Sequence, residues 1–166
     1  MATTIMSNTT LIRSVTALLV LLFVASFLSP ALCNQRDGEV CTQAFPGYLA
    51  AMGSMLVIRE LFADTEDFLE HPLGGLCATT AWVANIPFIL VALQLLISPK
   101  PRRLRWAVIA TAVAAVDAWL VPFVIMPKGS SMQEILLRGY WLWVSSLSLM
   151  AIWTFAVDRA WRRPQT

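Results

Sequence analysis

Three long apolar stretches constrain the fold of this chain more than any other feature of its sequence. They run over residues 77–98, 106–126 and 139–157, and each is close to the roughly 20 residues that an α-helix needs to cross a bilayer. Charged residues make up only 13% of the chain, whereas about a quarter of the residues of a soluble domain are charged. We therefore expect an all-α membrane protein whose helices form a compact bundle.

A fourth apolar stretch, residues 11–32, admits two interpretations. Arg13 is followed by an apolar run and then by the small residues Ser29-Pro30-Ala31, which is the layout of a secretory signal peptide with its cleavage site. The same stretch is long enough to remain as a transmembrane helix. We expect retention, which gives four transmembrane helices, and cleavage would leave three. Neither alternative changes the side of the membrane that later segments occupy.

The placement of Lys and Arg predicts the orientation of the bundle. Cytoplasmic segments of membrane proteins are enriched in these residues, and here they concentrate in the loop PKPRRLR, residues 99–105, and in the tail DRAWRRPQT, residues 158–166. We place both segments and residues 1–10 in the cytoplasm. Residues 33–76 and 127–138 are then outside, where eight acidic residues outnumber four basic ones. The protein is thus predicted to be multi-pass, with a cytoplasmic C-terminus.

The outer segment 33–76 contains a shorter apolar stretch, FPGYLAAMGSMLVIRELF at residues 45–62. Gly53 and Ser54 interrupt this stretch, and Arg59-Glu60 closes it. A span here would also move the basic loop 99–105 to the outside, against the charge rule. We expect instead an interfacial helix over about residues 46–62 on the outer face.

His71 follows a run of acidic residues in the same outer segment, and the group invites comparison with a metal site. Zinc sites use several His or Cys ligands, and calcium loops place their ligands at regular spacing around a glycine. The segment has neither pattern, so we expect a solvated acidic loop with no metal and no cofactor.

The three cysteines, Cys33, Cys41 and Cys77, all fall on the predicted outer side, where a disulfide can persist in an oxidising compartment. Pairing of Cys33 with Cys41 would close a short loop, whereas pairing of Cys41 with Cys77 would tie the loop to a span. The sequence does not choose between them.

The sequence contains no Cys-x-x-Cys, G-x-S-x-G, H-E-x-x-H or phosphate-binding glycine loop, so we expect no enzymatic activity.

Asp117 is the acidic residue inside the predicted span 106–126, and a carboxylate at such a depth is costly unless it has partners. Folding the chain about the middle of each loop places Asn85 level with Ala118, and Ser148 level with Asp117. Ser145 lies one turn from Ser148 on the same predicted helix. We therefore predict an intramembrane polar cluster of Asp117, Asn85, Ser148 and Ser145. Pro87 should interrupt the helix near Val83 and make room for Asn85.

Two roles for Asp117 remain open. Away from water the carboxyl group favours its neutral form and would donate a hydrogen bond to Asn85 or Ser148, which is a structural role. Alternatively, it would carry a proton or bind a small cation.

The nearby run GYWLW at residues 139–143 fits an interfacial aromatic belt. The other interpretation is that Tyr140, Trp141 and Trp143 stack on a ligand.

Three short pieces of the chain, PGYLAAMG at 46–53, AWVAN at 81–85 and GYWLWVSS at 139–146, carry a resemblance. They resemble a group of small uncharacterised bacterial multi-span membrane proteins, in which a Trp and an Asn mark one span and a Gly-Tyr-x-Leu-Trp run opens the last. Here Ile86 separates Asn85 from Pro87, where the resemblance leads us to expect Asn and Pro together. The resemblance implies a bacterial inner-membrane location and no assigned activity.

Two functions follow as hypotheses. The first is a non-enzymatic structural or accessory subunit of a membrane complex, with the lipid bilayer and another membrane protein or a second copy as partners. The second is an oligomeric transport or channel component that uses Asp117 for protons or small cations. An enzyme with the acidic outer loop as its site is a third and weaker alternative. Because no Arg-rich stretch is interleaved with aromatic residues, we expect no nucleic-acid partner.

Overall fold

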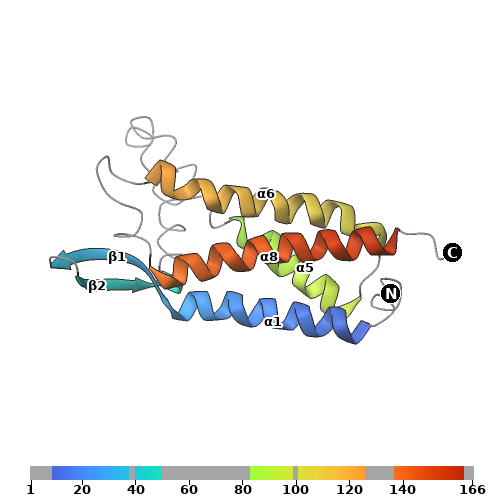
Figure 1. Ribbon diagram of the computed structural model, residues 1–166, viewed down its shortest axis with the longest axis horizontal. Coiled ribbons are helices and arrows are strands. Elements are labelled where there is room, and N and C mark those ends of the chain that lie inside the picture. The colour runs from blue at the N-terminus through green and yellow to red at the C-terminus, as the bar shows by residue number, and fades with distance from the viewer. Residues whose placement is uncertain (1–8, 38–39, 50–82, 99–100, 126–136, 163–166) are drawn as a thin grey trace, which may run out of the picture.

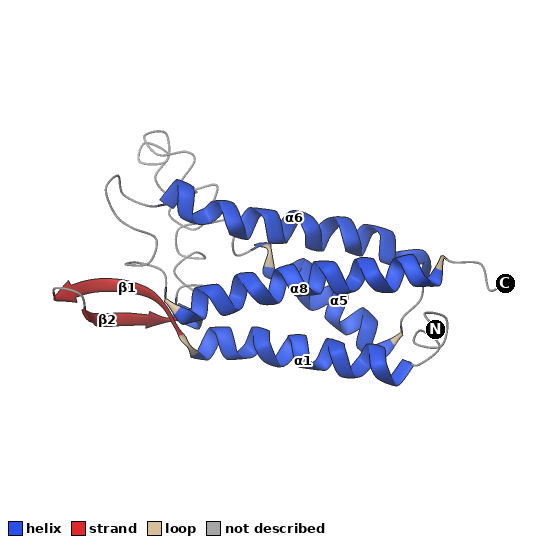
Figure 2. Ribbon diagram, in the orientation of Figure 1, coloured by secondary structure: helices blue, strands red, loops and turns tan. Residues whose placement is uncertain are grey.

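The computed structural model describes residues 9–37, 40–49, 83–98, 101–125 and 137–162. These ranges contain four helices and one β-hairpin, in the order α1 (Thr9–Leu28), β1 (Pro30–Asp37), β2 (Val40–Pro46), α5 (Asn85–Ile97), α6 (Pro101–Ile125) and α8 (Arg138–Trp161). Helices α1, α6 and α8 run along the long axis of the molecule, α5 is oblique to them in this view, and the hairpin projects from one end, which we call the hairpin end (Figure 1 and Figure 2). The prediction of a mainly helical fold is confirmed for this part of the chain.

Helix α8 is central to the bundle. It packs between α6 and α1, and α5 lies behind it against α1, α6 and α8 (Figure 1). The face of α1 that meets these neighbours consists of buried residues at alternating spacings of four and three, namely Ile12, Thr16, Leu19, Phe23 and Ser26. This spacing places all five on one side of a helix, so α1 is built into the bundle along most of its length.

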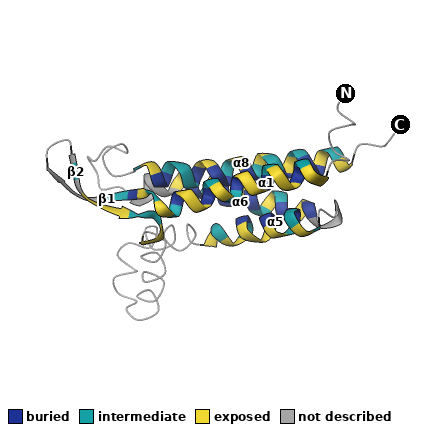
Figure 3. Ribbon diagram, turned by 90° about the horizontal axis from the view of Figure 1, so that it is seen from below, coloured by how far each residue is buried: buried dark blue, intermediate teal, exposed yellow. Residues whose placement is uncertain are grey.

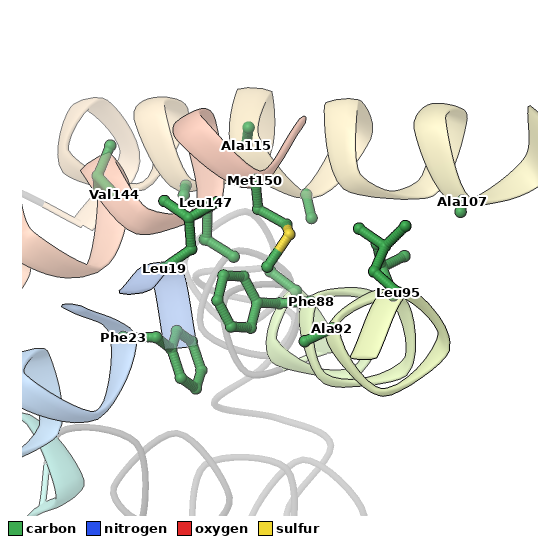
Figure 4. Close-up of a cluster of buried hydrophobic side chains, with 14 of the residues drawn as sticks. Leu19, Phe23, Phe88, Ala92, Leu95, Ala107, Ala115, Val144, Leu147 and Met150 are labelled. Atoms are coloured by element: carbon green, nitrogen blue, oxygen red, sulfur yellow. The ribbon is translucent and has the colours of Figure 1, made fainter. Parts of the chain in front are cut away.

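The hydrophobic core lies where α1, α5 and α8 meet. The rings of Phe23 on α1 and Phe88 on α5 stack with their centroids 4.1 Å apart. Leu147 and Met150 of α8 are fully buried beside them (Figure 4). Aromatic stacking adds to the stabilisation from the area that these rings remove from solvent, so Phe23 and Phe88 help to hold α1 against α5.

Helix α6 meets α8 through small residues. Its buried positions include Ala107, Thr111, Ala114, Ala115 and Ala118. Small side chains allow two helix backbones to approach closely, as is common between helices in membranes. Several large side chains of α6 are instead exposed, although Leu104 is fully buried.

Large apolar side chains cover the outside of the bundle as well as its interior. On α6 alone, Trp106, Ile109, Val113, Val116 and Leu120 are each at least half exposed, and exposed residues follow the outward sides of the helices (Figure 3). A helix that is apolar all round is typical of a protein core or a membrane span. Two helices, α1 and α8, are long and apolar enough to cross a membrane.

The hairpin was not predicted, because the outer segment was expected to contain only the interfacial helix. Helix α1 ends at Leu28, before the predicted limit of 32, since Pro30 cannot continue it. Strands β1 and β2 then pair antiparallel, from Pro30 with Pro46 to Asp37 with Val40. Strand β1 ends at Asp37, and the dipeptide Asp37-Gly38 in the sequence is a known hairpin signal that the hydropathy pattern obscures.

The hairpin is fixed to the helices by main-chain contacts. The amide of Gly47 donates to the carbonyl of Ser29 at 2.9 Å, and the amide of Leu137 donates to the carbonyl of Ala31 at 2.9 Å. Gly139 of α8 lies so close to this corner that a Cβ atom there would be 2.6 Å from the carbonyl oxygen of Ser29. The first turn of α8 is therefore held against the junction of α1 and β1.

The other helices begin or end at residues other than the predicted limits, and among the described helices α5 and α6 are not long and apolar enough to cross a membrane by the criterion that α1 and α8 meet. Helix α6 begins at Pro101, inside the predicted loop 99–105, because proline suits the first helical position. Helix α8 continues to Trp161, past the predicted limit of 157. Of the span 77–98, the structure describes residues 83–98: residue 83 is helical, Ala84 forms a turn and α5 follows. Pro87 thus lies in the first turn of α5, with the interruption directly before it.

Several predictions fall outside the described residues. Residues 47–49 are helical, but the rest of the predicted interfacial helix is not described. The same holds for the acidic loop with His71, for Cys77 and for most of the predicted outer loop 127–138.

Candidate functional site

Asp117 lies in the second half of α6, beside the small buried residues Ala114 and Ala118. The residue as a whole is partly exposed, but its Oδ2 atom is buried. The carboxylate is close enough to Tyr140 of α8 for its charge to act on the phenol. Asp117 is therefore located at the contact between α6 and α8, near the first turn of α8.

Tyr140 links these two helices directly. Its hydroxyl group donates a hydrogen bond of 2.5 Å to the main-chain carbonyl of Ala118, the residue after Asp117. The Tyr140 side chain is buried, and its ring packs edge-on against Trp141, with centroids 5.4 Å apart. The phenol and the carboxyl group thus occupy neighbouring positions in the α6–α8 contact.

Asn85, the first residue of α5, is held by α8. Its Oδ1 atom accepts a hydrogen bond of 2.7 Å from Nε1 of Trp143. Trp143 is one helical turn from Tyr140, and their ring centroids are 5.8 Å apart. Consecutive turns of α8 therefore reach Asn85 on one neighbouring helix and Ala118 on another.

Ser148 is held by a second tryptophan. Nε1 of Trp119 on α6 donates to Ser148 Oγ at 3.2 Å, and the serine hydroxyl donates to the carbonyl of Val144 at 2.9 Å. The sequence placed Ser148 level with Asp117, and its observed partner is two residues further along α6. The single hydroxyl proton of Ser148 is used within α8.

Ser145 is a different case, because its side chain is exposed on the outside of α8. The prediction that Ser145 belongs to the polar cluster with Ser148 is therefore wrong for Ser145. The fully buried serine of this helix is Ser146, whose hydroxyl donates to the carbonyl of Trp143 at 2.7 Å. The inward stripe of α8 passes through Tyr140, Val144, Leu147 and Met150, and this stripe is one position removed from the predicted one.

The structure therefore brings Asp117, Asn85 and Ser148 to the hairpin-end half of the bundle. Asn85 and Ser148, however, each accept a hydrogen bond from a tryptophan of a neighbouring helix. Trp143 was predicted to belong to an interfacial aromatic belt, and no role was predicted for Trp119. An indole N–H inside a predicted span would need an acceptor, and the few polar side chains of those predicted spans would be the available acceptors. That requirement is the signal that would have identified Trp119 and Trp143.

A third tryptophan extends the same arrangement to α1. Nε1 of Trp153 on α8 donates to Thr16 Oγ1 at 3.2 Å, and Thr16 is fully buried. Helix α8 thus shares an indole hydrogen bond with each of the three described helices that it contacts: with α5 through Trp143, with α6 through Trp119 and with α1 through Trp153. We call these three contacts the indole links.

At the hairpin end, Cys33 of β1 and Cys41 of β2 form a disulfide with their Cα atoms 5.9 Å apart. Of the pairings that the sequence left open, this is the one that closes a short loop. The disulfide joins the two strands of the hairpin.

Within the described ranges, no three His, Cys, Asp or Glu side chains form a group that could hold a metal ion. The polar groups at the site are one carboxyl group, one phenol, one amide and one hydroxyl. The amide and the hydroxyl serve as fixed acceptors for indole groups, whereas Asp117 and Tyr140 are the two that carry an exchangeable proton on a titratable group. The arrangement is suited to joining helices, and Asp117 with Tyr140 is its candidate for proton chemistry.

Comparisons of the chain with protein-family models, with curated proteins and with solved structures gave no match.

Proposed function

We propose that this chain is an integral membrane protein of a bacterial inner membrane and acts as a non-enzymatic structural or accessory subunit of a membrane complex. In this proposal α1, α5, α6 and α8 all lie in the bilayer. The hairpin is on the outer side, and the tail after α8 is cytoplasmic.

The exposed apolar surface supports the membrane location. Leu18, Leu21 and Leu28 of α1 and Leu90 and Ile97 of α5 are all more than 60% exposed. A soluble protein rarely leaves such contiguous apolar area in water, whereas lipid chains would cover it at no cost.

The hydroxyl groups support the same location. Thr16, Ser26, Thr111 and Thr154 each donate to a main-chain carbonyl three or four residues earlier in their own helix, at 2.6 to 2.8 Å. In a bilayer every polar hydrogen has to find an acceptor within the protein. Bonding back to the helix satisfies each hydroxyl without water.

The observation that supports the structural role is that, in the indole links, polar side chains accept hydrogen bonds from tryptophans of neighbouring helices. Asn85 and Thr16 accept indole hydrogen bonds from tryptophans of α8. Ser148 of α8 accepts one from the tryptophan of α6. Groups fixed in this way hold helices in register, and two of them are the residues that the alternative function would need as partners of Asp117. The outer faces of α1, α5 and α6 remain available for a partner protein.

A co-purification experiment tests the accessory role. The tagged chain would be extracted from native membranes in mild detergent, after confirming that alkaline carbonate does not release it. We expect an integral membrane protein to co-purify in a fixed ratio. A monodisperse monomer with no co-purifying membrane protein would rule out the accessory role, and release by carbonate would rule out the membrane location.

Proton or cation handling is the second candidate, favoured by the buried Oδ2 atom of Asp117 and the phenol beside it. An oligomer would supply the pathway, because four helices enclose little space. Proteoliposomes containing the wild type should then show proton or cation flux that Asp117→Asn abolishes while the protein still folds. Flux that is absent in the wild type, or unchanged in the variant, would reject this function.

A further inference from the structure

Three exposed arginines lie at the end of the bundle opposite the hairpin, which we call the arginine end. Arg13 is in the second turn of α1, Arg105 is in the second turn of α6, and Arg159 is in the last turn of α8. Helices α1 and α6 begin at this end, and α8 finishes there (Figure 1). The Arg13 guanidinium also reaches the last residue of α5, where it donates to the carbonyl of Ile97 at 3.4 Å. All three side chains are exposed.

Each of these arginines continues an exposed apolar stripe on its own helix. The stripe contains Leu21 and Val24 on α1, Ile109 and Val116 on α6, and Ile152 and Phe155 on α8. The spacings of three, four, seven and eight residues place each arginine in line with its stripe. On each of the three helices, an exposed arginine at the arginine end is therefore followed along the same side by exposed apolar side chains.

The positive charge of these three arginines is not neutralised within the described part of the chain. The ion pair found there joins Arg162 to Asp158 at 2.6 Å, and Arg13, Arg105 and Arg159 have no acidic partner among the described residues. A guanidinium group binds phosphate oxygens through paired hydrogen bonds. In a membrane, the nearest phosphates are those of the lipid headgroups, and the cytoplasmic leaflet is rich in anionic lipids.

We propose that the arginine end binds anionic phospholipids, whose phosphate groups contact Arg13, Arg105 and Arg159 while their acyl chains lie along the three stripes. A phospholipid has this same division into an anionic head and apolar chains, so one class of ligand satisfies both parts of the surface. The proposal rests on the membrane location proposed above, but carbonate extraction tests that location without reference to headgroup charge. The result of one experiment can therefore reject the lipid-binding proposal while the other experiment still supports the membrane location.

The test compares the thermal unfolding of the full-length protein in mild detergent with added lipid. The additives are phosphatidylglycerol, phosphatidylcholine and inorganic phosphate at equal phosphate concentration. The variant is R13Q/R105Q/R159Q, which leaves five basic residues of the loop and the tail to preserve orientation. The control is Arg138→Gln, because Arg138 is also exposed but opens α8 at the hairpin end.

We expect phosphatidylglycerol to raise the Tm of the wild type and of Arg138→Gln by about 2–4 °C more than phosphatidylcholine does. The triple variant should show no difference between the two lipids. Equal shifts in the wild type, an undiminished difference in the triple variant, or the same shift with inorganic phosphate would each overturn the proposal.

If the triple variant does not fold, native mass spectrometry of the wild type replaces it. The protein would be equilibrated with equal amounts of the two lipids, and the lipids that remain bound would be counted. Retention of more phosphatidylglycerol than phosphatidylcholine supports the proposal, and equal retention overturns it.

Discussion

Trp143 of α8 donates a hydrogen bond of 2.7 Å from its indole nitrogen to Oδ1 of Asn85, the residue that opens α5. Trp119 and Trp153 make equivalent bonds to Ser148 and Thr16. Each bond joins a large, mostly apolar side chain to a single polar atom on another helix. Tryptophan can thus fill space between helices and help to define their register at once, and α8 shares one such hydrogen bond with each neighbouring described helix.

Replacing Trp143 with Phe should destabilise the bundle by at least about 0.5–1.5 kcal/mol, because the hydrogen bond is lost and the smaller phenyl ring fills less of the space between the helices. The measurement is thermal unfolding followed by circular dichroism in mild detergent. Trp106→Phe is the matched control, since Trp106 is 78% exposed, and it should change the Tm little. If Trp143→Phe costs as much in an Asn85→Leu background as in the wild type, the two residues are not coupled.

The helices were predictable because their signal is strong and local: a long apolar run specifies a helix whatever its neighbours are. Their ends were less predictable, since α6 starts among arginines that hydropathy assigns to a loop but that favour helix. The hairpin was missed for a related reason. Residues 30–46 mix polar and apolar side chains without clear alternation, and the pairing of Cys33 with Cys41 depends on a fold that no single stretch of sequence reveals.

The candidate site was predictable in composition but not in connectivity. Rarity alone identified Asn85 and Asp117, because polar side chains in spans are few. Which atom bonds to which depends on helix rotation, and an error of one position moved Ser145 to the outside and left Ser146 unmentioned. How far a side chain extends toward a neighbouring helix is also not apparent from the sequence. The long side chains of Trp143 and Trp119 donate to Asn85 and Ser148, which we had predicted to be partners of Asp117.

Gly139→Ala should also destabilise the protein. The added Cβ atom would lie 2.6 Å from the carbonyl oxygen of Ser29 and 2.8 Å from that of Pro30, and main-chain atoms cannot rotate away as a side chain does. Overpacking of this kind costs about 1–3 kcal/mol, measurable as a lower Tm. Ser145→Ala, at an exposed position of the same helix, should leave the Tm nearly unchanged. A Gly139→Ala variant as stable as this control would show that the corner of α1 and β1 is not held against α8.

Single cysteine replacements should distinguish the pairing in the hairpin from its alternatives. Cys33→Ser and Cys41→Ser should each release one thiol that reacts with maleimide in the unfolded, non-reduced protein, beyond those of the wild type. Cys77→Ser should release none, because the disulfide joins Cys33 to Cys41. Mass spectrometry counts the added labels. A newly reactive thiol in Cys77→Ser would instead place Cys77 in the disulfide.

Phe23→Ala tests whether α1 remains part of the mature protein. Phe23 is 7% exposed and stacks on Phe88 at 4.1 Å, so truncating it removes a ring from the core and should cost about 3–5 kcal/mol. Leu21→Ala is the control, because Leu21 is 65% exposed on the outside of the same helix and faces lipid in the proposed orientation. If α1 were a cleaved signal peptide, both variants would yield the same mature protein with the same Tm. A large loss of stability for Phe23→Ala alone therefore requires that α1 be retained and packed against α5.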